Sequence, residues 1–117
     1  MDYKVYIAGE ITGDPDYEQN FGKAATELEK AGYVVINPAV LPSGLSYEAY
    51  IRITSAMLDE CDIVCLLPGW SKSYGAVDEY GRALRRNKLV ISFEDWLNER
   101  GTSMWDYQTQ NITGTTI

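Results

Sequence analysis

Residues 62–83 read DIVCLLPGWSKSYGAVDEYGRA, and this stretch decides the fold class. Its first six residues, 62–67, are apolar after Asp62, which is typical of a central parallel strand covered on both faces. A loop with Gly, Trp and three hydroxyl side chains follows, and a helix is predicted from about Gly75 to Arg86. A buried strand that leads through a polar loop into a helix is the building unit of open α/β sheets.

The rest of the chain continues this alternation. Further strands are predicted at 3–9, 33–38 and 88–92, and further helices between Pro15 and Ala31, from Ser46 to Glu60 and at 93–100. We therefore expect one α/β domain over 1–117: an open parallel sheet of four to five strands with helices on both faces, with its core at about 3–92. Right-handed crossovers place the loops after the first and third strands at the carboxyl edge of the sheet, where such folds bind ligands.

The charge of the chain limits its partners. It has 17 acidic and 10 basic residues, a formal net charge of −7. This charge repels a polyanionic duplex, so no nucleic-acid polymer is expected as a partner, and a single nucleotide in a neutral pocket stays open. No apolar run approaches the roughly 20 residues of a membrane span, and no signal-peptide pattern is present. We expect a cytoplasmic protein without a membrane partner.

The chain contains no histidine, which narrows its possible chemistry. Ser-His and Cys-His nucleophile systems are excluded, so any catalysis must use carboxylates, hydroxyls and backbone dipoles. Cys61 and Cys65 cannot complete a zinc site, and we expect buried thiols and no metal. Gly9 and Gly13 do not form the GxGxxG pattern, and Asn37 rather than an acid ends the second strand, so no dinucleotide cofactor is expected.

Glu79 is the first candidate for chemistry. The helix that contains it has a predicted buried stripe, to which Glu79 is adjacent: Ala76, Tyr80, Ala83 and Leu84. Partial burial raises the pKa of a carboxylate there, whereas the nearby helix N-terminus favours the anion. A poorly solvated but ionised carboxylate is suited to act as a nucleophile. The alternative is a surface ion pair of Glu79 with Arg82 or Arg86.

Four segments follow one another along the chain: VYIAGEITG (5–13), GYVVINPA (32–39), CDIVCLLPGW (61–70) and SYGAVDEYGRA (73–83). Together they resemble the nucleoside 2-deoxyribosyltransferase superfamily, which also contains the 2'-deoxynucleoside 5'-phosphate N-hydrolases. The resemblance covers roughly residues 3–92 and rests on the order and spacing of the segments. It implies a flavodoxin-like or Rossmann-like sheet with a nucleoside at its carboxyl edge, and a homo-oligomer, a dimer or higher, in which a neighbour completes the site.

The resemblance also implies roles for single residues. Glu79 would attack the anomeric carbon of the sugar, and Tyr6 matches a tyrosine near the nucleophile. Ser73, Gly75 and Glu79 match the SxGxxxE spacing of the monophosphate hydrolases, in which the serine helps to bind the 5'-phosphate. The positions expected to bind substrate are Gly9, Glu10, Thr12, Gly13, Asn37, Thr54, Trp70, Ser73 and Gly75.

The chain departs from the family pattern at several of these positions. Thr54 stands where both subgroups usually have an aspartate, so the acid that protonates the leaving base is open, with Glu10, Asp14 and Asp78 as candidates. Glu10 and Thr12 stand where the monophosphate hydrolases carry phosphate-binding Ser and Arg. The substrate is therefore left open between a nucleoside and a nucleoside 5'-monophosphate.

These observations lead to one functional hypothesis and one alternative. The hypothesis is cleavage or transfer of an N-glycosidic bond through a covalent glycosyl-Glu79 intermediate, with hydrolysis favoured over transfer because Ser73 is hydrolase-like. The alternative is a catalytically inactive module that binds or senses a nucleotide. Trp105 and Tyr107, in the C-terminal helix and tail at 93–117, are expected to pack on a neighbour or to cover the pocket.

Overall fold

The computed structural model describes residues 2–99, so Trp105 and Tyr107 lie outside the described residues. Four parallel strands form one sheet in the order β2-β1-β3-β4. The strands are β1 (Lys4–Ala8), β2 (Val34–Ile36), β3 (Ile63–Leu66) and β4 (Leu89–Ser92); the helices are α1 (Tyr17–Lys30), α2 (Tyr47–Asp59), α3 (Tyr74–Arg85) and α4 (Phe93–Asn98). Two short 3₁₀ turns, η1 (Pro38–Val40) and η2 (Trp70–Lys72), precede α2 and α3. The predicted α/β class and parallel sheet are confirmed.

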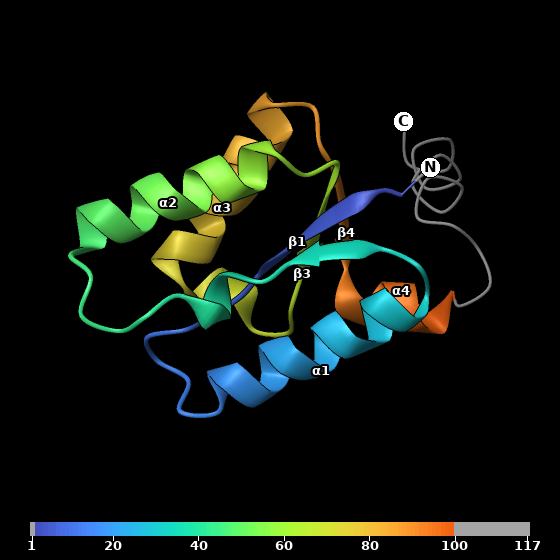
Figure 1. The fold of residues 1–117 in the computed structure, drawn as a ribbon, viewed down its shortest axis with the longest axis horizontal. Coiled ribbons are helices and arrows are strands. Elements are labelled where there is room, and N and C mark those ends of the chain that lie inside the picture. Colours follow the sequence, from blue (N-terminus) through green and yellow to red (C-terminus); the bar gives the residue numbers. More distant parts are fainter. Residues whose placement is uncertain (1, 100–117) are drawn as a thin grey trace.

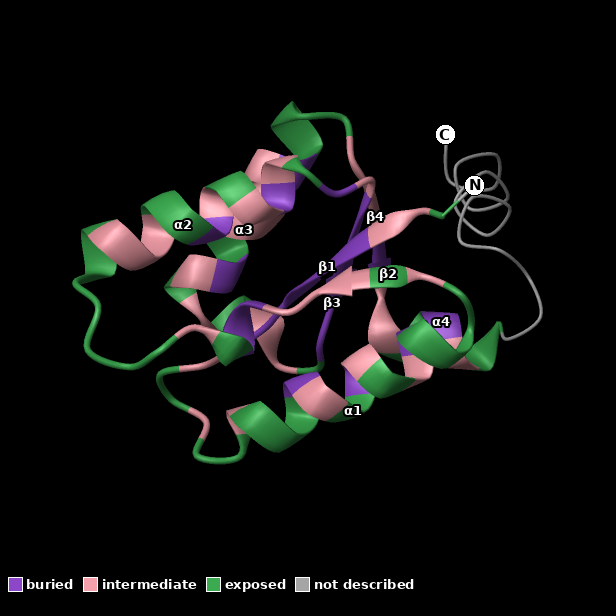
Figure 2. Ribbon diagram, in the orientation of Figure 1, coloured by how far each residue is buried: buried purple, intermediate pink, exposed green. Residues whose placement is uncertain are grey.

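Helices cover both faces of the sheet, with α2 and α3 on one face and α1 and α4 on the other (Figure 1). The two central strands, β1 and β3, are almost entirely buried (Figure 2). This burial on both faces is the reason for the continuous apolar run at 62–67, since a strand covered on both sides has no face for polar residues. Among the described residues, no helix is both long and apolar enough to cross a membrane.

Alternation along β1 divides its side chains between the two cores. Val5 and Ile7 pack toward α1 and α4, whereas Tyr6 and Ala8 pack toward α2 and α3. Tyr6 is fully buried, so its hydroxyl has to find a partner on the α2–α3 side.

The two cysteines are buried free thiols, as predicted. Cys61 lies at the end of α2 next to β3, and Cys65 lies within β3. Burial raises the pKa of both thiols to about 12, so they stay protonated at neutral pH.

The buried side of α3 differs from the predicted stripe. Ala76 and Ala83 are buried, but Leu84 is 52% exposed, so its place in the stripe was wrong. Ala76 and Ala83 are at the centre of the contact between α3 and the sheet. Because each residue turns the helix by about 100°, Leu84, which follows Ala83, is turned away from this contact. The small alanine side chains let the helix approach the sheet closely.

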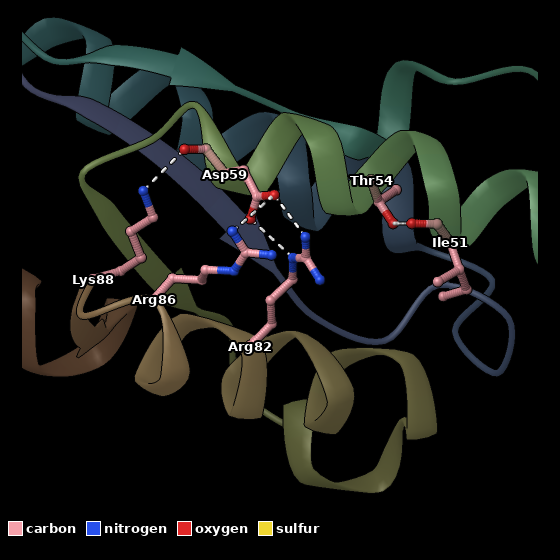
Figure 3. Close-up of polar contacts among 6 residues, drawn as sticks. All are labelled: Ile51, Thr54, Asp59, Arg82, Arg86 and Lys88. Carbon is pink, nitrogen blue, oxygen red and sulfur yellow. Dashed lines mark hydrogen bonds and ion pairs between the residues drawn. The ribbon is translucent and has the colours of Figure 1, made fainter.

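Asp59, the last residue of α2, joins this helix to α3 (Figure 3). Its carboxylate accepts hydrogen bonds from Arg82 Nε at 2.8 Å and Arg82 Nη2 at 2.6 Å. Arg86 Nη1 lies 3.9 Å from the same carboxylate, and Lys88 Nζ donates to the backbone carbonyl of Asp59 at 2.9 Å. The alternative that paired Glu79 with Arg82 or Arg86 is therefore wrong, because both guanidinium groups are directed to Asp59.

Replacing Asp59 by Asn is expected to lower the free energy of unfolding at pH 7 by about 1–2 kcal/mol, because a bidentate, partly buried ion pair is lost. The Arg82 hydrogen bonds lower the pKa of Asp59, so this stabilisation is present above the ordinary carboxyl pKa and is lost as the pH falls through the lowered one. Urea unfolding at pH 7 measures the difference. Glu29→Gln, at an exposed position of α1, is the control; an equal loss in both variants would contradict the role of Asp59.

Candidate active site

A cavity of about 370 Å³ lies at the carboxyl edge of the sheet. Its wall comes from the loop after β1, from η1 and the loop that follows it, and from the first turns of α2 and α3. Gly9 and Thr12 from the first loop line the same cavity as Ser73 and Gly75. The loops after the first and third strands thus meet at one site, as the strand order predicts.

Glu79 lines this cavity and is hydrogen-bonded to Tyr6 of β1. The Tyr6 hydroxyl donates a short hydrogen bond to Glu79 Oε2. Burial raises the pKa of Glu79 to about 7, with a smaller rise from the charge of Asp78, and the Tyr6 hydrogen bond opposes this rise. Burial and the neighbouring carboxylate hold the pKa of Tyr6 well above its usual value, so Tyr6 remains a protonated donor.

The local sequence explains how Glu79 reaches this position. Ser73 caps α3, its Oγ accepting a hydrogen bond from the Ala76 backbone N–H at 3.2 Å. Glu79 follows Ala76 by three residues and precedes Ala83 by four, so it lies beside the two alanines that contact the sheet. Because α3 approaches the sheet closely at these alanines, the Glu79 carboxylate reaches a side chain of the central strand β1.

Thr54 lies behind this pair rather than on the cavity wall. Its side chain is 1% exposed, and its hydroxyl lies 3.4 Å from the Ile51 carbonyl oxygen in the preceding turn of α2 (Figure 3). Burial and Glu79 raise the pKa of Tyr6, and a hydrogen bond with Thr54 opposes this rise only in small part. Thr54, Tyr6 and Glu79 therefore form a polar chain from the α2–sheet interface to the cavity.

Besides Thr54, four of the expected substrate positions are not among the residues that line the cavity. Asn37 accepts a hydrogen bond from the Ala39 backbone N–H at 2.9 Å and thereby caps η1. Trp70 packs against the Tyr80 ring, with 5.0 Å between the ring centroids. Glu10 lines a second cavity, of about 250 Å³, and its carboxylate lies against Gly13.

The three candidate acids also lie away from the main cavity. Glu10 and Asp14 both line the second cavity, next to α1, and Asp14 accepts a hydrogen bond from Asn20 at 2.9 Å. Asp78 is exposed on α3. Among the described residues that line the main cavity, Glu79 is the single carboxylate.

Three tyrosines that line the cavity were not predicted as site residues: Tyr17, Tyr47 and Tyr50. Tyr47 and Tyr50 fit one apolar face of α2, which is the side of a helix that normally packs on a sheet. Tyr47 is instead 60% exposed, because the first turn of α2 borders the cavity rather than the sheet. The sequence feature that could have indicated a cavity here is the pair Tyr47 and Tyr50, three residues apart directly after the Ser46 cap. A tyrosine ring is apolar and its hydroxyl is polar, so tyrosines are suited to a partly exposed cavity wall.

Comparison with known proteins addresses the same part of the chain. Residues 3–93 match the family described as a domain of unknown function (DUF4406). The chain belongs to the DUF4406 family. The matched range contains both Tyr6 and Glu79, so the whole site described above lies within the DUF4406 domain. No curated protein matches the sequence significantly.

Two solved structures share the fold of this DUF4406 domain. A 2-deoxyribosyltransferase from Leishmania mexicana superposes with a TM-score of 0.62 at 21% identity, over 77% of this chain and 63% of that one. A CMP N-glycosidase from Clostridium botulinum superposes with a TM-score of 0.59 at 18% identity, over 92% of this chain and 96% of that one. The DUF4406 domain thus spans 63% of the length of the Leishmania enzyme, and the resemblance to the deoxyribosyltransferase superfamily is confirmed at the level of the fold.

Proposed function

We propose that the DUF4406 domain cleaves the N-glycosidic bond of a nucleoside or nucleoside 5'-monophosphate, with Glu79 as the nucleophile. The observation that carries this proposal is the half-buried Glu79 carboxylate in the main cavity, which accepts a hydrogen bond from Tyr6 at one oxygen. The fold neighbours support the reaction class, because one is a deoxyribosyltransferase and the other an N-glycosidase. The tyrosines of the wall supply faces on which a nucleobase can stack.

The proposed reaction has two displacements at C1' of the sugar. In the first, a deprotonated oxygen of Glu79 bonds to C1', the C1'–N bond breaks, and its electron pair leaves with the base. In the second, water attacks C1', the C1'–O bond to Glu79 breaks, and the carboxylate is regenerated. The proton that water gives up balances the negative charge of the departed base. Transfer would differ only in that a second base replaces water, and Ser73 favours the hydrolytic version.

Release of free base tests this proposal. Nucleosides and nucleoside 5'-monophosphates are incubated with the protein, and the products are separated by chromatography. The proposal expects free base and free sugar or sugar phosphate from at least one substrate. If folded protein leaves every member of the panel intact, the proposal is wrong.

We expect a nucleoside to be preferred over its 5'-monophosphate by at least about tenfold in kcat/KM. No Lys or Arg occurs among the described residues that line the cavity, and a phosphate would bring about two negative charges near Glu79. The N-terminus of α3 offsets only part of this repulsion. The two substrates are compared with one base, for example deoxycytidine and its 5'-monophosphate.

A reversed preference would contradict this expectation. The exposed Lys72, which directly precedes Ser73, is the cation to test in that case. If Lys72→Ala then lowers kcat/KM for the monophosphate and not for the nucleoside, the phosphate is bound by a side chain outside the cavity wall.

A second candidate function is a binding module without turnover. It is favoured by one observation: Glu79 is the single carboxylate lining the cavity in residues 2–99, so no second carboxylate is present there to protonate a leaving base. If the domain is a binding module, calorimetry should show that a nucleoside binds to both the wild type and Glu79→Gln. Neither protein should then release free base. Base release that depends on Glu79 would exclude it.

A further inference from the structure

Departure of the base is the step for which the described cavity offers no carboxylic acid. When the C1'–N bond breaks, the electron pair on the base has to be stabilised by a proton or a hydrogen-bond donor. Glu79 is engaged with C1' in this step, and Glu10, Asp14 and Asp78 all lie away from the main cavity. The donor therefore has to come from another kind of side chain on the wall.

Several hydroxyl side chains lie on the wall, and Tyr50 is the one on α2 that is half-buried beside Glu79. It lies on α2 one turn before Thr54, on the same face, but at the cavity rather than behind it. It lines the same cavity as Glu79, whose negative charge adds to the effect of burial in raising the pKa of Tyr50. The Tyr6 hydroxyl already donates to Glu79, and Tyr6 is not among the residues that line the cavity.

We propose that the Tyr50 hydroxyl, which lines the main cavity together with Glu79, donates a hydrogen bond to the nucleobase as its bond to C1' breaks. This inference rests on the glycosidase reaction proposed above. It assigns Tyr50 a catalytic role in base departure and leaves nucleophilic attack to Glu79. Tyr17, at the start of α1, lines the same cavity.

The proton stays on Tyr50 throughout this step. Burial and the charge of Glu79 raise the pKa of Tyr50 above its usual value, so the phenol is neutral at any pH suited to an assay. It therefore stabilises the developing negative charge as a donor and is not consumed. The base takes its proton from the water that hydrolyses the glycosyl ester, which closes the proton balance.

The test uses two substrates with the same sugar and different leaving groups: a 2'-deoxynucleoside and a 4-nitrophenyl 2-deoxyriboside. Nitrophenolate is a stable anion that needs little help from a donor. Tyr50→Phe is expected to lower kcat for the nucleoside by about 10- to 100-fold with KM nearly unchanged, and kcat for the nitrophenyl glycoside by less than about threefold. Tyr74→Phe, which removes a hydroxyl at an 89% exposed position outside the cavity lining, should change neither.

A second variant separates a lost donor from a disturbed wall. Tyr50→His returns a ring N–H, and it should recover part of the nucleoside turnover lost in Tyr50→Phe. Equal losses on the two substrates, or no loss on the nucleoside, would overturn the role of Tyr50 and leave the proposed function standing. Glu79→Gln should turn over neither substrate. If the wild type turns over neither, the proposed function and this inference both fail.

Discussion

Glu79→Gln is expected to lower the rate of base release by at least about a thousandfold and to leave ligand binding largely intact. An amide oxygen is a poor nucleophile and cannot form the glycosyl ester. Glutamine has nearly the same size as glutamate, and its Oε1 can still accept the hydrogen bond of Tyr6, which holds residue 79 in the structure. The cavity wall is thus preserved while the attacking group is removed.

Chromatographic turnover and calorimetric binding measure the two parts of this prediction. Glu29→Gln, an exposed substitution on α1, is the matched control and should behave as the wild type. Because the nucleophile has to be deprotonated, wild-type kcat should rise with pH through about 7, the pKa to which burial raises Glu79. Retention of more than about a tenth of the wild-type rate in Glu79→Gln would contradict its role as nucleophile.

The same substitution is expected to stabilise the protein at alkaline pH. Burial raises the pKa of Glu79 from 4.5 to about 7, so the folded protein holds this proton more tightly than the unfolded chain. Stability from this group is full below the unfolded pKa and is lost as the pH rises through 7. Between pH 5 and pH 8 the wild type should therefore lose on the order of 2 kcal/mol relative to Glu79→Gln, since each pKa unit is worth about 1.4 kcal/mol.

Urea unfolding of both proteins at pH 5 and pH 8 measures this relative loss. Comparison with Glu79→Gln cancels the titration of all other groups, and Glu29→Gln again serves as the control because its carboxylate is exposed. A stability difference between wild type and Glu79→Gln that does not change with pH would show that Glu79 titrates normally, and the desolvated nucleophile would lose its physical basis.

The parts of the fold that repeat a simple pattern could be predicted from the sequence. The apolar run at 62–67 marks β3 because a strand buried on both faces has no polar positions. Glu79 could be found because its spacing from Ala76 places it beside the buried side of a helix. Its partner Tyr6 came from the family resemblance, since no local pattern links β1 with α3.

The parts that depend on packing between elements could not be predicted. Tyr50 fits an apolar helix face equally well whether that face borders the sheet or an open cavity, and only the position of α2 decides between them. Glu10 follows the first strand directly, but the course of the loop directs it to the second cavity. Trp70 packs on Tyr80, a residue ten positions later, which no short-range spacing reveals.

The central claim is that Glu79 forms a covalent bond to the sugar, and mass spectrometry of acid-quenched protein tests it most directly. The wild type is mixed with a nucleoside that it cleaves, quenched during turnover and digested. The account predicts a peptide containing Glu79 that is heavier by one glycosyl group, and no such peptide from Glu79→Gln. Turnover without any adduct, or an adduct on a different residue, would contradict it.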